Sequence, residues 1–158
     1  MGKISTADVR NHLDGLGISY RHLTHAETRT SAESAAVRGE PLENGAKALV
    51  MKVGEQFHVL VLSAAHKADS GEIKRHFGAR SVRFATPEEL LELTGLVPGS
   101  VPPFGEPVLP LKLYVDEHIR SLERVAFNAA SLTESIIMSA IDYMRAAAPV
   151  EVFRFSTT

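Results

Sequence analysis

The sequence has no cysteine and no tryptophan, and aromatic residues make up only 6% of its 158 residues. The absence of cysteine excludes a thiol nucleophile, a thiolate-ligated zinc, an iron–sulfur cluster and a disulfide framework. No apolar run approaches the roughly 18 residues of a membrane span. The opening segment, MGKISTADVR, lacks the apolar core of a signal peptide. We therefore expect a cytoplasmic protein that does not contact a membrane.

The chain has no large excess of positive or negative charge, because it contains 17 Lys and Arg residues and 19 Asp and Glu residues. A protein so close to neutral can contact a nucleic acid only through a local patch. Internal repeats, low-complexity runs and linkers are also absent, and 44% of the residues are hydrophobic. The composition therefore predicts one domain over residues 1–158.

Motifs that bind metals or phosphates are missing as well. The seven histidines form no HExxH motif or similar ligand pair, and no Walker or dinucleotide loop is present. Ser100 lies in Pro-Gly-Ser-Val-Pro, which is not the strand–turn–helix setting of a GxSxG nucleophile. We expect no metal and no cofactor.

Helix starts are well marked. Ser5 and Thr30 each precede an acidic residue by three positions, which is typical of a capping box, and Thr86-Pro87 is a strong N-terminal signal. Together with stops at glycine, these signals predict helices over about 5–15, 30–38, 69–77 and 86–94.

Strand signals alternate with the helices. Residues 48–53 and 57–62 are apolar, rich in β-branched side chains and joined by Gly54-Glu55-Gln56, which predicts a hairpin. Further strands are expected at 18–23, 81–85, 111–115 and 124–128. This order predicts an α/β domain with a mixed sheet.

Two segments do not fit that scheme simply. Five of the eight prolines lie within 96–110, so this stretch is expected to be irregular but stiff. Ser131 and Glu134 resemble a capping box, so the local pattern alone favours one long helix after residue 131.

Three features could carry chemistry. Lys47 enters an apolar strand, where a cation faces either an anion or, in the simpler interpretation, water at a sheet edge. The Gly95–Gly105 loop can present backbone amides to a carbonyl oxygen, or merely connect a helix to a strand. Residues 66–83 are locally basic and either follow an RNA backbone or form a solvated helix face; the basic residues are Lys67, Lys74, Arg75, Arg80 and Arg83.

These pieces, taken in order, resemble the YbaK/prolyl-tRNA-editing domain family of aminoacyl-tRNA deacylases, which is related to the insertion domain of bacterial prolyl-tRNA synthetase. The resemblance covers nearly the whole chain. It rests on four marks: Gly45-Ala46-Lys47-Ala48-Leu49, the run from Gly78 to Leu90, Gly99-Ser100-Val101-Pro102-Pro103-Phe104-Gly105, and Phe127-Asn128-Ala129-Ala130-Ser131.

The resemblance implies a single α/β domain with a curved mixed sheet flanked by helices and a pocket between the sheet and the proline-rich loop. It also implies a strand at 134–138 and a helix at 139–147, against the local pattern. Ala130 replaces a glycine that is common in relatives and would narrow one wall of the pocket, which leaves the size limit of the substrate open.

The resemblance further implies roles for individual residues. Lys47 would hold the terminal phosphate of the tRNA or position the substrate, and amides of Gly99, Ser100 and Val101 would stabilise the oxyanion. The substrate-binding set would comprise His25, Lys47, Gly95, Pro102, Pro103, Phe104, Asp116, Asn128, Ala130 and Ser131.

The implied activity is hydrolysis, in trans, of the ester that joins a small wrong amino acid (alanine, serine, threonine or cysteine) to tRNA. A second, hydrolytic site is needed because the binding free energies of two small side chains in an apolar pocket differ by only about 1–3 kcal/mol, so a synthetase attaches some wrong amino acids. The implied partner is mischarged tRNA rather than DNA, with an aminoacyl-tRNA synthetase as a further partner. The alternatives are a module that binds the aminoacyl end or a small ligand without turnover, and a metal-dependent hydrolase.

Overall fold

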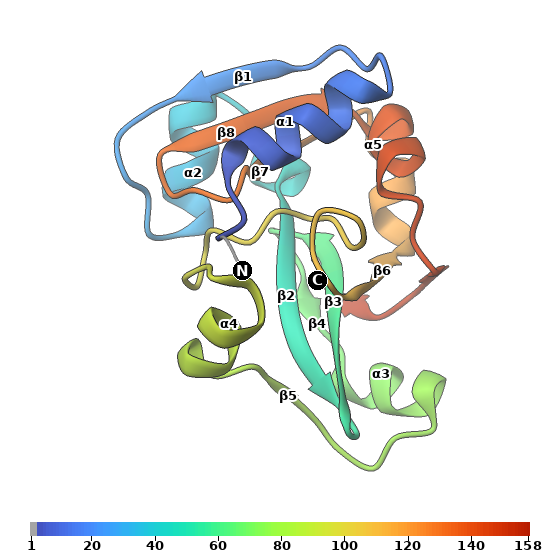
Figure 1. The fold of residues 1–158 in the computed structure, drawn as a ribbon. Helices are drawn as coiled ribbons and strands as arrows, with labels where there is room; N and C mark the ends of the chain where they lie inside the picture. Colours follow the sequence, from blue (N-terminus) through green and yellow to red (C-terminus); the bar gives the residue numbers. More distant parts are fainter. Residues whose placement is uncertain (1–2) are drawn as a thin grey trace.

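The predicted hairpin lies at the centre of the computed structural model, which describes residues 3–158 (Figure 1). Its strands are β2 (Ala46–Val53) and β3 (Gln56–Ser63), which pair antiparallel along their full length. From His58 onward every residue of β3 is buried. This burial on both faces explains why β3 is a continuous apolar run rather than an alternating one.

The hairpin belongs to a five-stranded sheet with the order β5-β2-β3-β6-β9. The other strands are β5 (Val82–Phe84), β6 (Lys112–Asp116) and β9 (Glu151–Phe153). The sheet is mixed, because β5 and β2 pair antiparallel whereas β3, β6 and β9 run parallel. The α/β fold class with a mixed sheet is confirmed.

A second, antiparallel sheet has the order β1-β8-β7 and consists of β1 (Arg21–Thr24), β7 (Arg124–Asn128) and β8 (Glu134–Ser139). An isolated parallel bridge between Gly45 and Ala126 joins it to the start of β2. A third pair consists of β4 (Lys67–Ala68) and β10 (Ser156–Thr157). The strands β4, β9 and β10 were not predicted.

Within residues 3–158 the α-helices are α1 (Thr6–Gly15), α2 (Ser31–Arg38), α3 (Ser70–Phe77), α4 (Pro87–Thr94) and α5 (Ala140–Ala147), which surround the sheets (Figure 1). Two 3₁₀ turns are η1 (Leu42–Asn44) and η2 (Glu117–Ser121). The capping boxes at Ser5, Thr30 and Thr86 are all present. No helix in the described part of the chain is long and apolar enough to cross a membrane.

The start of the first strand differs from the prediction, whereas the segment after residue 133 agrees with it. The first strand begins three residues later than predicted, because the Ile18 amide donates to the Leu13 carbonyl and extends the end of α1. The segment after residue 133 is a strand followed by a helix, as the family resemblance implied. Ser139 caps that helix by accepting a hydrogen bond from the Asp142 amide at 3.1 Å.

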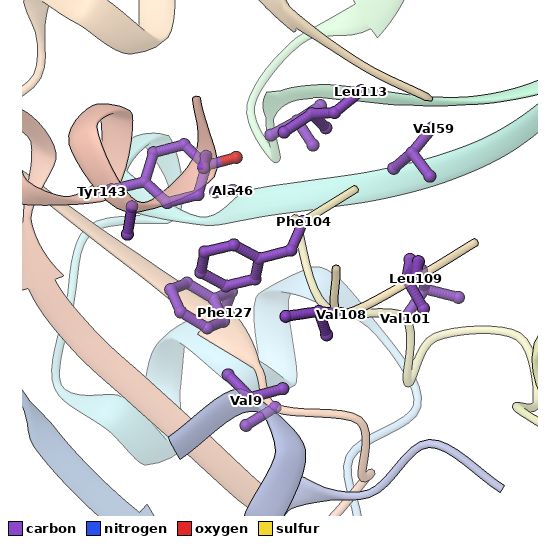
Figure 2. Close-up of a cluster of buried hydrophobic side chains, with 14 of the residues drawn as sticks. Val9, Ala46, Val59, Val101, Phe104, Val108, Leu109, Leu113, Phe127 and Tyr143 are labelled. Atoms are coloured by element: carbon purple, nitrogen blue, oxygen red, sulfur yellow. The ribbon is translucent and has the colours of Figure 1, made fainter. Parts of the chain in front are cut away.

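The proline-rich segment is anchored in the larger hydrophobic core (Figure 2). Phe104 is 1% exposed and packs edge-on against Phe127 and Tyr143. The Tyr143 hydroxyl donates to the Pro103 carbonyl at 2.6 Å, and complete burial raises the pKa of this phenol. The segment is therefore irregular but held in place, as expected from its prolines.

Candidate active site

A cavity of about 350 Å³ opens where β2 begins, between α2, the proline-rich segment and β7. Many of its apolar walls are small side chains, which suits a small occupant. The cavity contains four of the predicted site residues. Its lining consists of Thr28–Ser31, Ser34, Ala35, Arg38, Leu42, Gly45–Leu49, Ala64, Pro98, Gly99, Val101, Ala126–Asn128 and Leu132.

Lys47 is one of these lining residues, and its ammonium donates to the carbonyl of His66 at 2.7 Å. Burial lowers the pKa of Lys47, and the nearby Lys67 cation lowers it further. An ammonium has three donors, so two remain after the bond to His66. Lys47 is thus a half-buried cation on the cavity wall rather than a lysine extended into water.

Residues 97–100 form a tight turn that contributes Pro98 and Gly99 to the cavity lining. The Ser100 amide donates to the Val97 carbonyl at 3.1 Å, with Pro98 and Gly99 at the two central positions. Gly99 has a φ of +89°, which is the left-handed conformation that glycine provides in a type II turn. In the described part of the chain, the amides of Gly99 and Val101 have no hydrogen-bond partner. These two amides are the donors that remain for a substrate.

This turn corrects the predicted role of Ser100 and of the residues after it. The amide and the hydroxyl of Ser100 both donate to the Val97 carbonyl, and the residue is 3% exposed and outside the cavity lining. Pro102 and Pro103 have no amide proton. The set of amide donors is therefore reduced to Gly99 and Val101.

Behind the cavity lies a buried network around Arg38, a residue that the sequence analysis did not select. Its guanidinium donates to the Ser135 hydroxyl at 3.0 Å and to the Asn128 side-chain oxygen at 2.8 Å. The Asn128 amide in turn donates to the Gly99 carbonyl at 2.6 Å. Burial lowers the pKa of Arg38 to about 10. Arg38 thus holds Asn128, and Asn128 holds the turn that contains the free amides.

His25 joins this network from the far side of Ser135. One ring nitrogen lies 2.8 Å from the Ser135 hydroxyl and the other lies 2.8 Å from the Ala26 carbonyl. Because both nitrogens are engaged and the ring is outside the cavity lining, His25 supports Arg38 rather than facing a substrate.

Six other predicted substrate contacts lie outside the cavity lining, Pro102 and Pro103 among them. Gly95 ends α4 with a φ of +74°, Phe104 is in the core, and the Ser131 hydroxyl is 3.0 Å from that of Thr133. Ala130 is 7% exposed with a φ of +62°, a conformation that costs a residue with a side chain roughly 1–2 kcal/mol. Because Ala130 does not line the cavity, its methyl group does not narrow the wall, contrary to the concern raised by the sequence.

Asp116 is also outside the cavity, and it is 1% exposed. Its carboxylate accepts from the Phe155 amide at 2.8 Å and from the Ser156 hydroxyl at 2.7 Å. Since that hydroxyl proton is used, the Nδ1 of His66, which lies 2.9 Å from the Ser156 oxygen, is the donor of their bond. Asp116 therefore anchors the C-terminal strands and, through Ser156, the residue whose carbonyl holds Lys47.

We expect Asp116→Ala to lower the free energy of unfolding by about 3 kcal/mol, because buried donors lose a charged acceptor. The free energy is measured by urea denaturation. Glu117→Ala is the matched control, since its side chain is exposed and forms no hydrogen bond within the described residues. A loss no larger than that of the control would contradict the structural role of Asp116.

The basic residues predicted to follow RNA do not gather at the cavity. Only Lys67 lies close to Lys47. Arg83 is on β5, which pairs with the turn end of β2, and α3 lies at that same end (Figure 1). Arg83 also forms two bonds to Glu89, and Arg75 pairs with Glu72. RNA binding by Lys74, Arg75, Arg80 and Arg83 stays a prediction, and none of the four lines the cavity.

Sequence reasoning missed Arg38, Thr28 and Ser34. Arg38 stands in the last turn of a short helix, where a cation ordinarily complements the helix dipole at the surface. Its burial depends on β8 and β7, which lie about a hundred residues later. Within the described residues, no group of three or more His, Asp or Glu side chains is placed to hold a metal ion.

Comparison with known proteins gives consistent results. The model of the aminoacyl-tRNA editing domain family matches residues 25–146. The multifunctional Ser/Thr-tRNA deacylase ProXp-y of Escherichia coli K12 is 38% identical over 148 residues, covering 90% of this chain and 87% of that protein.

Two further relatives place the domain in context. A proline–tRNA ligase of Staphylococcus epidermidis is 27% identical over 129 residues, so 80% of this chain spans only 22% of that enzyme. The crystal structure of a proposed trans-editing enzyme for prolyl-tRNA synthetase superposes with a TM-score of 0.84 at 26% identity, covering 100% of both chains. These matches confirm the resemblance drawn from the sequence: the chain belongs to the aminoacyl-tRNA editing domain family.

Proposed function

We propose that this protein is a free-standing deacylase that hydrolyses the ester of a small mischarged amino acid, serine or threonine above all, on tRNA in the cytoplasm. The observation that carries the proposal is that Lys47, Gly99 and Val101 line one small cavity and that, within the described residues, the amides of Gly99 and Val101 have no hydrogen-bond partner. The activity printed for the E. coli relative, Ser/Thr-tRNA deacylation, supports the choice of amino acid.

The chemistry follows from these groups. The Lys47 ammonium holds the phosphate of the terminal nucleotide, which places the ester against the turn. The Gly99 and Val101 amides donate to the carbonyl oxygen and stabilise the negative charge that develops there. Arg38 and Asn128 keep the turn in position before the substrate arrives, so little reorganisation is needed.

The attacking oxygen is proposed to come from water rather than from a side chain. Water adds to the carbonyl carbon, the bond to the ribose oxygen breaks, and that oxygen takes up the proton that the water loses, either directly or through the neighbouring ribose hydroxyl. The cavity lining contains serine and threonine hydroxyls, but no histidine, aspartate or glutamate among the described residues lines it. A hydroxyl without an adjacent base is a weak nucleophile. An aminoacyl ester is already activated, so positioning and charge stabilisation suffice.

The test is a panel of tRNA esters carrying labelled serine, threonine, alanine, cysteine or proline. We expect catalytic loss of label from the seryl and threonyl esters and much slower loss from the prolyl ester, which serves as the control for non-specific hydrolysis. Protection of the esters without turnover would support the alternative, a module that only binds the aminoacyl end. Adding a purified synthetase to the same assay tests whether such a partner changes the rate.

A further inference from the structure

We propose that the buried hydroxyls of Thr28 and Ser34 form a specificity-determining pair that recognises the side-chain hydroxyl of the substrate amino acid. The two oxygens lie 2.8 Å apart, and both residues line the cavity although they are only 4% and 5% exposed. This inference rests on the proposed function and deepens it, because it identifies what distinguishes serine and threonine from alanine.

The backbone fixes both residues independently of their side chains. Thr28 precedes α2, and its amide donates to the Leu132 carbonyl at 3.2 Å. Ser34 lies within α2, and its amide donates to the Thr30 carbonyl at 3.0 Å. The hydroxyl pair is therefore held by two separate anchors, which gives it a defined position on the cavity wall.

The pair has unused hydrogen-bonding capacity. Each hydroxyl carries one proton and two lone pairs, so the single bond between them leaves one proton and three lone pairs. In the described part of the chain, neither hydroxyl has another hydrogen-bond partner. A buried donor without a partner costs about 1–3 kcal/mol. A ligand hydroxyl, which both donates and accepts, would satisfy this capacity.

The other polar groups deep in the cavity are already engaged. Arg38 donates to Ser135 and Asn128, Asn128 also donates to Gly99, and Lys47 donates to His66. The neighbouring walls at Ala35, Ala46 and Ala126 are apolar. Ser31 and Thr30 also line the cavity, but both residues are exposed. Among the described lining residues, the hydroxyl pair is thus the buried uncharged group left to distinguish one small side chain from another. Sites built to hydrogen-bond a substrate hydroxyl discriminate strongly against the analogue that lacks it.

The experiment compares kcat/KM for seryl-, threonyl- and alanyl-tRNA in the wild-type protein and in the Thr28→Val and Ser34→Ala variants. Thr28→Val keeps the shape of the side chain and replaces its hydroxyl by a methyl group. We expect the preference for the seryl over the alanyl ester to fall about 10-fold in each variant, the usual effect of one lost hydrogen bond. The rate on the alanyl ester should stay close to that of the wild type.

Two controls isolate the hydroxyl. Thr28→Ser retains it and should retain the preference. Thr24→Val makes the same change as Thr28→Val at an exposed position on β1 and should leave all three rates unaltered. Circular dichroism during thermal unfolding shows whether each variant is folded.

The outcomes separate this inference from the proposed function. A wild-type protein that hydrolyses none of the esters overturns the proposed function. A wild-type protein that hydrolyses the seryl and alanyl esters equally well overturns the hydroxyl pair alone, whatever the variants do. Variants that slow all three esters by the same factor also overturn it, because they show a structural role.

Discussion

Replacing Lys47 by alanine is expected to reduce kcat/KM for seryl-tRNA about 100-fold while leaving the protein folded. Losing the ammonium removes the group that holds the terminal phosphate, and misplacing an ester relative to its oxyanion donors costs roughly this factor. The fold should survive because, within the described residues, the Lys47 side chain forms one hydrogen bond, to the His66 carbonyl, and the backbone pairing of Lys47 in β2 is unaffected by the change. The rate is measured as loss of labelled serine under single-turnover conditions.

Lys112→Ala is the matched control, since this lysine is exposed at the start of β6. Its rate should equal that of the wild type. A Lys47→Ala protein with unchanged turnover would remove Lys47 from the mechanism. Unfolding curves for both variants distinguish a catalytic defect from a loss of structure.

Replacing Gly105 by alanine is expected to destabilise the protein by about 3 kcal/mol, at the upper end of the usual cost of overpacking a core. A Cβ atom at this position would lie 2.7 Å from the Leu111 carbonyl oxygen and 2.8 Å from the Cβ of Leu113. The backbone at these two residues leads into β6, the strand parallel to β3, so neither can move aside easily. The free energy of unfolding is measured by urea denaturation.

Gly15→Ala provides the control for this substitution. No atom lies within 4 Å of the position that its Cβ would occupy, and the residue is the last of α1. Alanine there should leave stability unchanged or raise it slightly, because it restricts the unfolded chain more than glycine does. Equal stability of the two variants would show that the backbone at Leu111 is free to adjust.

The parts of the fold that the sequence predicts are those determined locally. The capping boxes at Ser5, Thr30 and Thr86 begin helices because a side chain and an amide three residues away satisfy each other without help from the rest of the chain. The hairpin at 46–63 is likewise a contact between neighbours. The short strands β4, β9 and β10 were missed because two or three residues carry no periodic pattern and their pairing is long-range.

The strand at 134–139 shows where local pattern fails. Its apolar residues suit a helix, and only pairing with β1 and β7 makes it a strand. The family resemblance supplied that information, whereas the residue pattern alone gave the opposite result.

The same distinction applies to the site: residues that are unusual within their own segment were predicted, and residues that depend on distant partners were not. Lys47 and Gly99 were selected because a cation in an apolar strand and a glycine in a proline-rich loop are unusual locally. Asp116 was expected to bind the substrate and Arg38 was not selected, since the surroundings of each depend on partners far along the chain. The amide of Ser100 was predicted to be free, but whether an amide is occupied depends on the turn geometry, which composition does not reveal.

The bridge between Gly45 and Ala126 has a consequence for how activity relates to folding. The cavity is built from segments 28–49, 98–101 and 126–132, and the bridge joins the two sheets beside it. No single stretch of chain contains the cavity, so a molecule in which the two sheets are not packed together lacks a complete binding site. Specific activity should therefore report the fraction of molecules in which the two sheets are assembled, and activity should be lost together with the packing between them.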